Sequence, residues 1–221
     1  MNKLEIACFN YQSALIAQQG GADRIELCDN FKEGGTTPDY SIVAKASNEI
    51  KIDLFVMIRP RGGNFVYTSE EFEQMKKDIL HFKNLNVDGF VFGILNEDNS
   101  INIQQNKELI QLASPLPCSF HRAFDKIDNQ QTALESVINC GFKTILTSGF
   151  TSSAMNGIKN LEQLVKASRN RITIMPGGGV RSSNIAQIKN KTQAHYYHSS
   201  AIIQGDIADV NEVKKLKEQL N

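Results

Sequence analysis

The sequence has no excess of either charge. Its 221 residues include 24 Lys and Arg and 24 Asp and Glu, so the formal net charge at pH 7 is zero. Because no overall field attracts a polyanion, we expect neither nucleic acid nor an anionic membrane surface as a partner. A local basic site that is balanced by acidic residues elsewhere remains compatible with this sum.

Long apolar runs and paired cysteines are also missing. No window approaches the ~20 apolar residues of a membrane-spanning helix, and the N-terminus lacks the charged, apolar and cleavage regions of a signal peptide. The four cysteines, Cys8, Cys28, Cys118 and Cys140, show no CxxC spacing. This pattern favours reduced thiols over a disulfide framework. We therefore expect a soluble, cytoplasmic protein.

Regular alternation of two kinds of segment is the main feature that is present. Apolar residues make up 41% of the chain, enough for a packed core, and short apolar runs alternate with longer amphipathic segments. The predicted strands are residues 4–8, 24–28, 52–58, 87–92, 116–120, 144–147, 172–175 and 194–198. The predicted helices are residues 11–19, 38–48, 69–82, 103–112, 129–140, 153–168, 182–190 and 210–220.

Strict alternation of strand and helix predicts a parallel sheet. Eight units in this length indicate an α/β fold, a single-domain TIM (β/α)8 barrel that spans residues 1–221, because no linker or change of composition divides the chain. An open, doubly wound sheet is the alternative that the pattern leaves open. In a barrel, the loops after the strands carry the functional residues.

Glycines and a serine in the last two of these loops suggest an anion site. Gly177, Gly178 and Gly179 allow the backbone to approach a ligand, and the next helix is expected to begin at Ser182 with its positive end nearby. Together with Ser199 after the last strand, they match the phosphate site that many barrels build there. The alternative is a tight turn that needs glycine and binds nothing.

Arginines follow two other predicted strands. Arg59 and Arg61 flank Pro60, which stiffens the segment, and Arg122 follows the fifth strand. Guanidinium groups in a fixed arrangement suit a carboxylate or a phosphate. Solvated arginines, or arginines paired to acids, are the structural alternative.

Two acids, Glu5 and Glu26, lie inside the first two predicted strands. A buried carboxylate is costly unless it is paired, so we expect ion pairs with the arginines of the loops. The catalytic alternative makes Glu26, or His121 after the fifth strand, a general acid or base.

Cys8 and Cys28 end two neighbouring strands, and soft thiolates suit Cu(I). Alternation along the strands complicates a shared site, because Glu26 and Cys28 fall on one face whereas Glu5 and Cys8 do not. The structural alternative is that both are small buried hydrophobic residues.

These segments together resemble the CutC family of cytoplasmic copper homeostasis proteins. The resemblance rests on residues 4–8 (LEIAC), 21–28 (GADRIELC), 33–38 (EGGTTP), 58–63 (IRPRGG), 120–125 (FHRAFD), 146–149 (LTSG) and 198–201 (HSSA). It implies a TIM barrel, homo-oligomers in some members, a part in copper handling, and Cys8 and Cys28 as candidate Cu(I) ligands.

Three departures from the family pattern are Ala7, where many members have cysteine, Asn64 and Phe150. Ala7 weakens any copper site built on the first strand. Two hypotheses follow, and neither includes an organic cofactor. One is a Cu(I)-binding homeostasis protein, and the other is a TIM-barrel enzyme for a small anionic, phosphorylated metabolite that the arginines would clamp.

Overall fold

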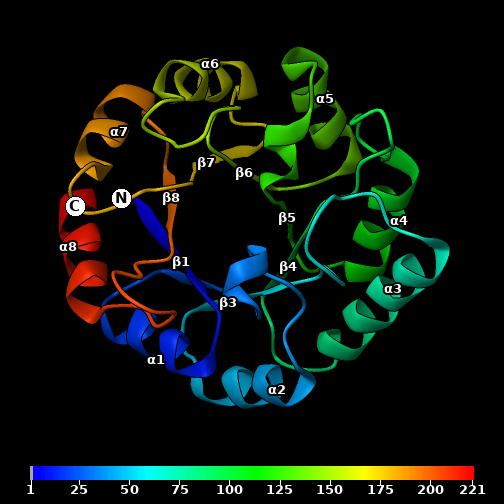
Figure 1. The fold of residues 1–221 in the computed structure, drawn as a ribbon, viewed down its shortest axis with the longest axis horizontal. Coiled ribbons are helices and arrows are strands. Elements are labelled where there is room, and N and C mark those ends of the chain that lie inside the picture. Colours follow the sequence, from blue (N-terminus) through cyan, green and yellow to red (C-terminus); the bar gives the residue numbers. More distant parts are fainter. Residues whose placement is uncertain (1) are drawn as a thin grey trace.

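The computed structural model describes residues 2–221, apart from the side chains of residues 130 and 131, and shows a ring of eight strands inside a ring of eight helices (Figure 1). The strands are β1 Lys3–Cys8, β2 Arg24–Leu27, β3 Asp53–Met57, β4 Gly89–Phe92, β5 Cys118–Phe120, β6 Thr144–Thr147, β7 Thr173–Pro176 and β8 Tyr196–Ser199. The helices are α1 Tyr11–Gln19, α2 Tyr40–Glu49, α3 Ser69–Lys83, α4 Ile103–Ala113, α5 Gln130–Cys140, α6 Ile158–Ser168, α7 Ile185–Thr192 and α8 Val210–Leu220. This order confirms the predicted TIM barrel.

The sheet is parallel throughout and nearly closed. Its hydrogen-bonded ladder runs from β7 down to β1 and then to β8, so the last strand pairs with the first. At the remaining seam β7 and β8 lie side by side (Figure 1), and the Ser199 hydroxyl donates to the carbonyl of Val180 at 2.7 Å. Consecutive strand order around the ring excludes the doubly wound alternative.

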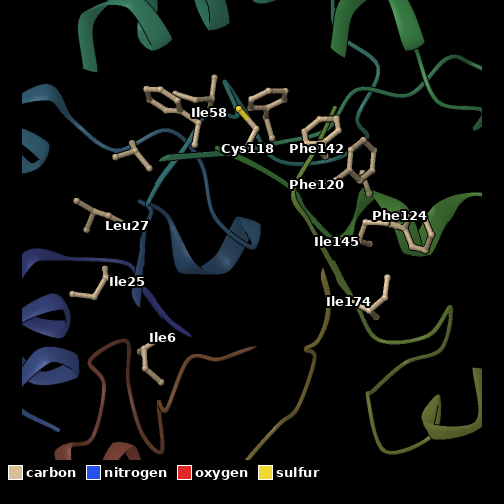
Figure 2. Packing of buried hydrophobic residues seen from close by; sticks show 14 of the residues in the cluster. Ile6, Ile25, Leu27, Ile58, Cys118, Phe120, Phe124, Phe142, Ile145 and Ile174 are labelled. Carbon is tan, nitrogen blue, oxygen red and sulfur yellow. The ribbon is translucent and has the colours of Figure 1, made fainter. Parts of the chain in front are cut away.

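Alternating residues of each strand supply two separate layers. Outward-facing side chains such as Ile6, Ile25 and Leu27 point toward the helices and join the main hydrophobic core (Figure 2). The residues between them therefore face the inside of the barrel. This interior holds a small apolar cluster around Phe55 and Met57, together with the charged side chains described below.

Most element boundaries agree with the pattern in the sequence. The helix α3 begins at Ser69 as predicted, because Thr68 and Glu71 form a reciprocal capping box. Two predicted starts are wrong. The helix α6 begins at Ile158 instead of residue 153, and α7 begins at Ile185 instead of Ser182, because turns occupy both preceding segments.

Within the described residues, no helix is both long and apolar enough to cross a bilayer. This agrees with the lack of long apolar runs in the sequence.

The aromatic cluster outside β5 provides a test of the packing. Phe120 is fully buried, and its ring meets those of Phe124 and Phe142 edge to face (Figure 2). We expect Phe120→Ala to lower the free energy of unfolding by about 3–5 kcal/mol, since it removes a large buried side chain and leaves a cavity. Denaturant unfolding measures this loss. The control is Phe31→Ala, whose ring is 43% exposed, and equal losses in the two variants would contradict the assigned core.

Candidate functional site in the barrel interior

Three ionisable side chains from neighbouring strands meet inside the barrel. Glu5 on β1, Glu26 on β2 and His198 on β8 are all buried, and their donor atoms lie within 4.8 Å of one another. Strand register explains the meeting, because Glu5 stands opposite His198 and Ala7 stands opposite Glu26. This group is the densest cluster of potential metal ligands or proton-transfer groups in the described part of the chain.

The histidine lies between the two carboxylates. His198 Nδ1 is 2.8 Å from Glu5 Oε1, and His198 Nε2 is 3.9 Å from Glu26 Oε2. Arg24 donates through Nη1 to the second oxygen of Glu5 at 3.3 Å. Both oxygens of Glu5 are therefore engaged, whereas Glu26 Oε1 is buried without a hydrogen-bond partner among residues 2–221.

These contacts set the charges of the group. Burial opposes ionisation of Glu5, but the hydrogen bond and charge of His198 and the charge of Arg24 outweigh it, so the pKa of Glu5 is lowered. Burial raises the pKa of Glu26 to about 7, although the charge of His198 opposes this shift. Burial disfavours protonation of His198, yet the two carboxylates outweigh it and raise its pKa. The group can therefore hold or exchange a proton at Glu26 near neutral pH.

The expected pairing of Glu5 and Glu26 with the loop arginines is wrong. The partner of Glu5 is Arg24, which lies within β2 itself. Arg59 and Arg61 follow β3, and their partners lie in the loops after β2 and β3 and at the start of α3. Arg59 donates to the carbonyls of Glu33, Gly35 and Gly63, and Arg61 pairs with Glu71 at 2.6 Å.

Arg122 lies against the glycine loop of residues 177–179. Its guanidinium bonds to Asp125 and to the Ser148 hydroxyl, both at 2.9 Å, and lies so close to Gly178 that a Cβ there would stand 3.2 Å from it. Gly178 and Gly179 have positive φ angles of 93° and 72°. A side chain at either position would be strained, so glycine is required here.

Ser199 lies at the other end of this loop and also contacts an arginine that the sequence analysis missed. Arg181 donates to the Ser199 hydroxyl at 3.2 Å and to the carbonyl of Ile202. Its position two residues after Gly179 could have identified Arg181 as a candidate anion-binding residue. Gly177 is packed against Leu146 and His198, where a Cβ would overlap the leucine.

His121 is buried against Phe65, with the ring centroids 4.8 Å apart. Its Nδ1 accepts a hydrogen bond from the Ala123 N–H, so the remaining proton of the neutral ring is on Nε2. Burial and the nearby charge of Arg59 lower the pKa of His121 to about 3. At neutral pH this side chain is a hydrogen-bond donor, and its Nε2 has no partner within the described residues.

Cys8 and Cys28 lie in different layers, as strand alternation predicts. Cys8 belongs to the main core outside the sheet, whereas Cys28 belongs to the inner cluster with Phe55 and Met57. Their backbones are adjacent, since the Cys28 N–H donates to the carbonyl of Cys8 at 2.8 Å. Burial and the negative charge of Glu26 raise the pKa of both thiols well above the usual range. Both side chains are therefore thiols, not thiolates, at neutral pH.

The buried neutral imidazole of His121 makes stability depend on pH. Between its folded pKa of about 3 and an unfolded value of about 6.5, the unfolded chain binds a proton that the folded chain does not. This contribution destabilises the protein as pH falls from about 6.5 toward 3, by at most about 1.4 kcal/mol per pH unit.

We expect His121→Gln to show a smaller loss of stability between pH 7 and 4.5 than the parent chain, measured by urea unfolding. The matched control is His81→Gln on the exposed face of α3, which should leave the slope unchanged. Parallel curves for the parent and His121→Gln would contradict the inference.

Comparison with known proteins identifies one family over most of the chain. The family model described as the CutC family matches residues 2–203. The chain is 42% identical over 198 residues to the human protein named copper homeostasis protein cutC homolog, a match that covers 90% of this chain and 72% of the human one. It is 40% identical over 212 residues to the family protein CutC of Chromobacterium violaceum, covering 96% and 85%.

Comparison with solved structures supports the same family and the same fold. The CutC protein of Streptococcus agalactiae superposes with a TM-score of 0.86 at 36% identity, covering 90% of this chain and 99% of that one. The phosphoribosyl anthranilate isomerase of Thermotoga maritima superposes with a TM-score of 0.66 at 14% identity, covering 100% and 98%. The second likeness concerns the barrel fold alone. The match of the family model and of the relatives over most of the chain shows that the chain belongs to the CutC family.

Proposed function

We propose that the protein binds Cu(I) as part of copper homeostasis. The observation that supports this most is the buried thiol of Cys28, which lies inside the barrel beside Glu26, with Cys8 at the end of the adjacent strand. Cysteine sulfur is a soft ligand that selects Cu(I), and binding of the ion would release the proton of each thiol. Human and mouse relatives carry the name copper homeostasis protein.

The two thiols contribute unequally in this proposal. Cys28 already faces the interior, whereas Cys8 is packed in the outer core and its sulfur contacts the carbonyl of Ile6 at 3.5 Å. Cys8 can join the ion only if its side chain leaves this packing. Cys28 is therefore the first ligand and Cys8 the second.

We further propose that the protein is cytoplasmic, since reducing conditions keep unpaired thiols available. We also propose that it forms a homo-oligomer, as the resemblance to the family implies.

Serine variants test the thiols as Cu(I) ligands. We expect the double variant Cys8→Ser, Cys28→Ser to lose at least tenfold in Cu(I) affinity, and Cys28→Ser alone to lose more than Cys8→Ser alone. The measurement is an anaerobic competition titration against a Cu(I) chelator. Cys118→Ser is the matched control, because Cys118 is equally buried but belongs to β5. Unchanged affinity in the double variant would remove these ligands from the proposal.

A second candidate function is an enzyme for a small anionic, phosphorylated metabolite. The specific observation in its favour is that two arginines, Arg122 and Arg181, lie at the glycine loop with Ser199. Guanidinium groups and backbone amides together bind phosphate well. Glu26, whose pKa is raised to about 7, would transfer the proton, and His121 would donate a hydrogen bond from Nε2.

Substitution of Arg122 tests this second function. In the parent chain, inorganic phosphate and sugar phosphates should raise the melting temperature, because a ligand that binds only the folded state stabilises it. We expect Arg122→Gln to lose most of this shift relative to its own ligand-free value. The control is Arg171→Gln, whose partner is Glu135 and which precedes β7 at the opposite end of the barrel. Equal shifts in both variants would count against an anion site at the glycine loop.

A further inference from the structure

A gap between an imidazole and an unpaired carboxylate lies inside the barrel. We propose that Glu26 and His198 bind a divalent transition-metal ion across this gap, with Glu5 fixing the histidine from behind. This site is separate from the Cu(I) thiols, and it does not depend on the function proposed above.

The distances are those of two ligands and not of a hydrogen bond. His198 Nε2 and Glu26 Oε2 are 3.9 Å apart, beyond the range of an N–H···O bond. Two ligand atoms that each bind one ion at about 2.0–2.2 Å are separated by at most about 4.4 Å. The gap therefore accepts a cation with only small movements of the two side chains.

A carboxylate orients the ring of His198, as is common for histidines that bind metals. Glu5 Oε1 accepts the proton of His198 Nδ1 at 2.8 Å, which leaves the lone pair of the neutral ring on Nε2, facing Glu26. A carboxylate behind a ligating histidine fixes the tautomer and orientation of the ring in many metal sites. Arg24 engages the other oxygen of Glu5, so Glu5 is kept in this supporting place.

Glu26 supplies an independent observation. Its side chain is only 4% exposed, and Oε1 has no hydrogen-bond partner in the described chain. A buried carboxylate without a partner is costly, and the hydrogen bond of nearby Arg24 goes to Glu5. A cation bound at Glu26 Oε2, across the gap from His198, would offset the cost of burying this carboxylate.

The donor atoms favour a borderline or hard divalent ion over Cu(I). The carboxylate of Glu26 and the imidazole of His198 are oxygen and nitrogen donors, which suit Zn²⁺ and the neighbouring first-row ions, whereas Cu(I) prefers sulfur. Two protein ligands also leave coordination positions free for outside oxygens. The alternative is an ion network of Glu5, His198 and Glu26 that binds no metal and only ties β8, β1 and β2 together.

A spectroscopic titration separates these two possibilities. The full-length protein is stripped with a chelator, freed of the chelator, and titrated with Co²⁺, whose visible ligand-field bands report coordination by protein atoms. We expect saturation at one Co²⁺ per chain, and bleaching of the bands when Zn²⁺ displaces the cobalt. Absence of bands and of Zn²⁺ binding in the parent chain would establish an ion network only and overturn the proposal.

Isosteric variants identify the ligands. Glu26→Gln and His198→Gln should each weaken Co²⁺ binding at least tenfold, and Glu5→Gln should weaken it about 10–100-fold through the orientation of the ring. The matched control is His195→Gln, an exposed histidine directly before β8, which should bind as the parent does. Unchanged binding in Glu26→Gln would overturn the assignment.

Two further measurements keep the result interpretable. Circular dichroism and melting of the metal-free variants report folding, and Glu26→Gln carries the test if His198→Gln fails to fold, since Glu26 Oε1 has no hydrogen bond to lose. Cys28→Ser should retain the Co²⁺ bands. If Cys28→Ser abolished them while Glu26→Gln did not, the ion would belong to the thiols and this proposal would be wrong, whatever the outcome for Cu(I).

Discussion

The arrangement of side chains inside the barrel depends on how its buried charges are compensated. Glu5 has no exposed surface, and its two oxygens are engaged by His198 from β8 and Arg24 from β2. Loss of one partner of a buried pair typically costs about 3–5 kcal/mol, because the other charge remains without compensation. These contacts cross three adjacent strands beside the seam of the ring. The side chains that give the interior its chemistry thus also tie β8, β1 and β2 together.

The arginines of the loops after the strands stabilise those loops and not the interior. With 221 residues, the chain is shorter than the ~250 residues of a typical barrel. Arg59 connects three loop carbonyls, and Arg61 binds Glu71, which itself caps α3. These guanidinium groups connect the loops through hydrogen bonds and an ion pair. Arg122 and Arg181 differ because they reach the glycine loop, where an anion would sit.

The architecture could be predicted from the sequence because each strand and helix leaves a local pattern. The starts of α6 and α7 could not, because serine and asparagine serve equally in a turn or as the first helical residues. The partners of Glu5 and Glu26 were also beyond local reasoning. They depend on the register between β1 and β8, whose paired residues Glu5 and His198 are 193 positions apart. A histidine at the end of a strand carries no signal of its own, so His198 was missed.

The substitution at Ala7 connects the two proposed metals. Ala7 is buried and stands opposite Glu26 in the ladder, so its side chain faces the interior. A cysteine at this position, which the resemblance to the family implies for many members, would place a second thiol near Cys28, as Cu(I) prefers. Alanine removes that sulfur and leaves every oxygen and nitrogen donor of the interior in place. The change therefore lowers the preference of this barrel for a soft ion more than its capacity for a divalent one.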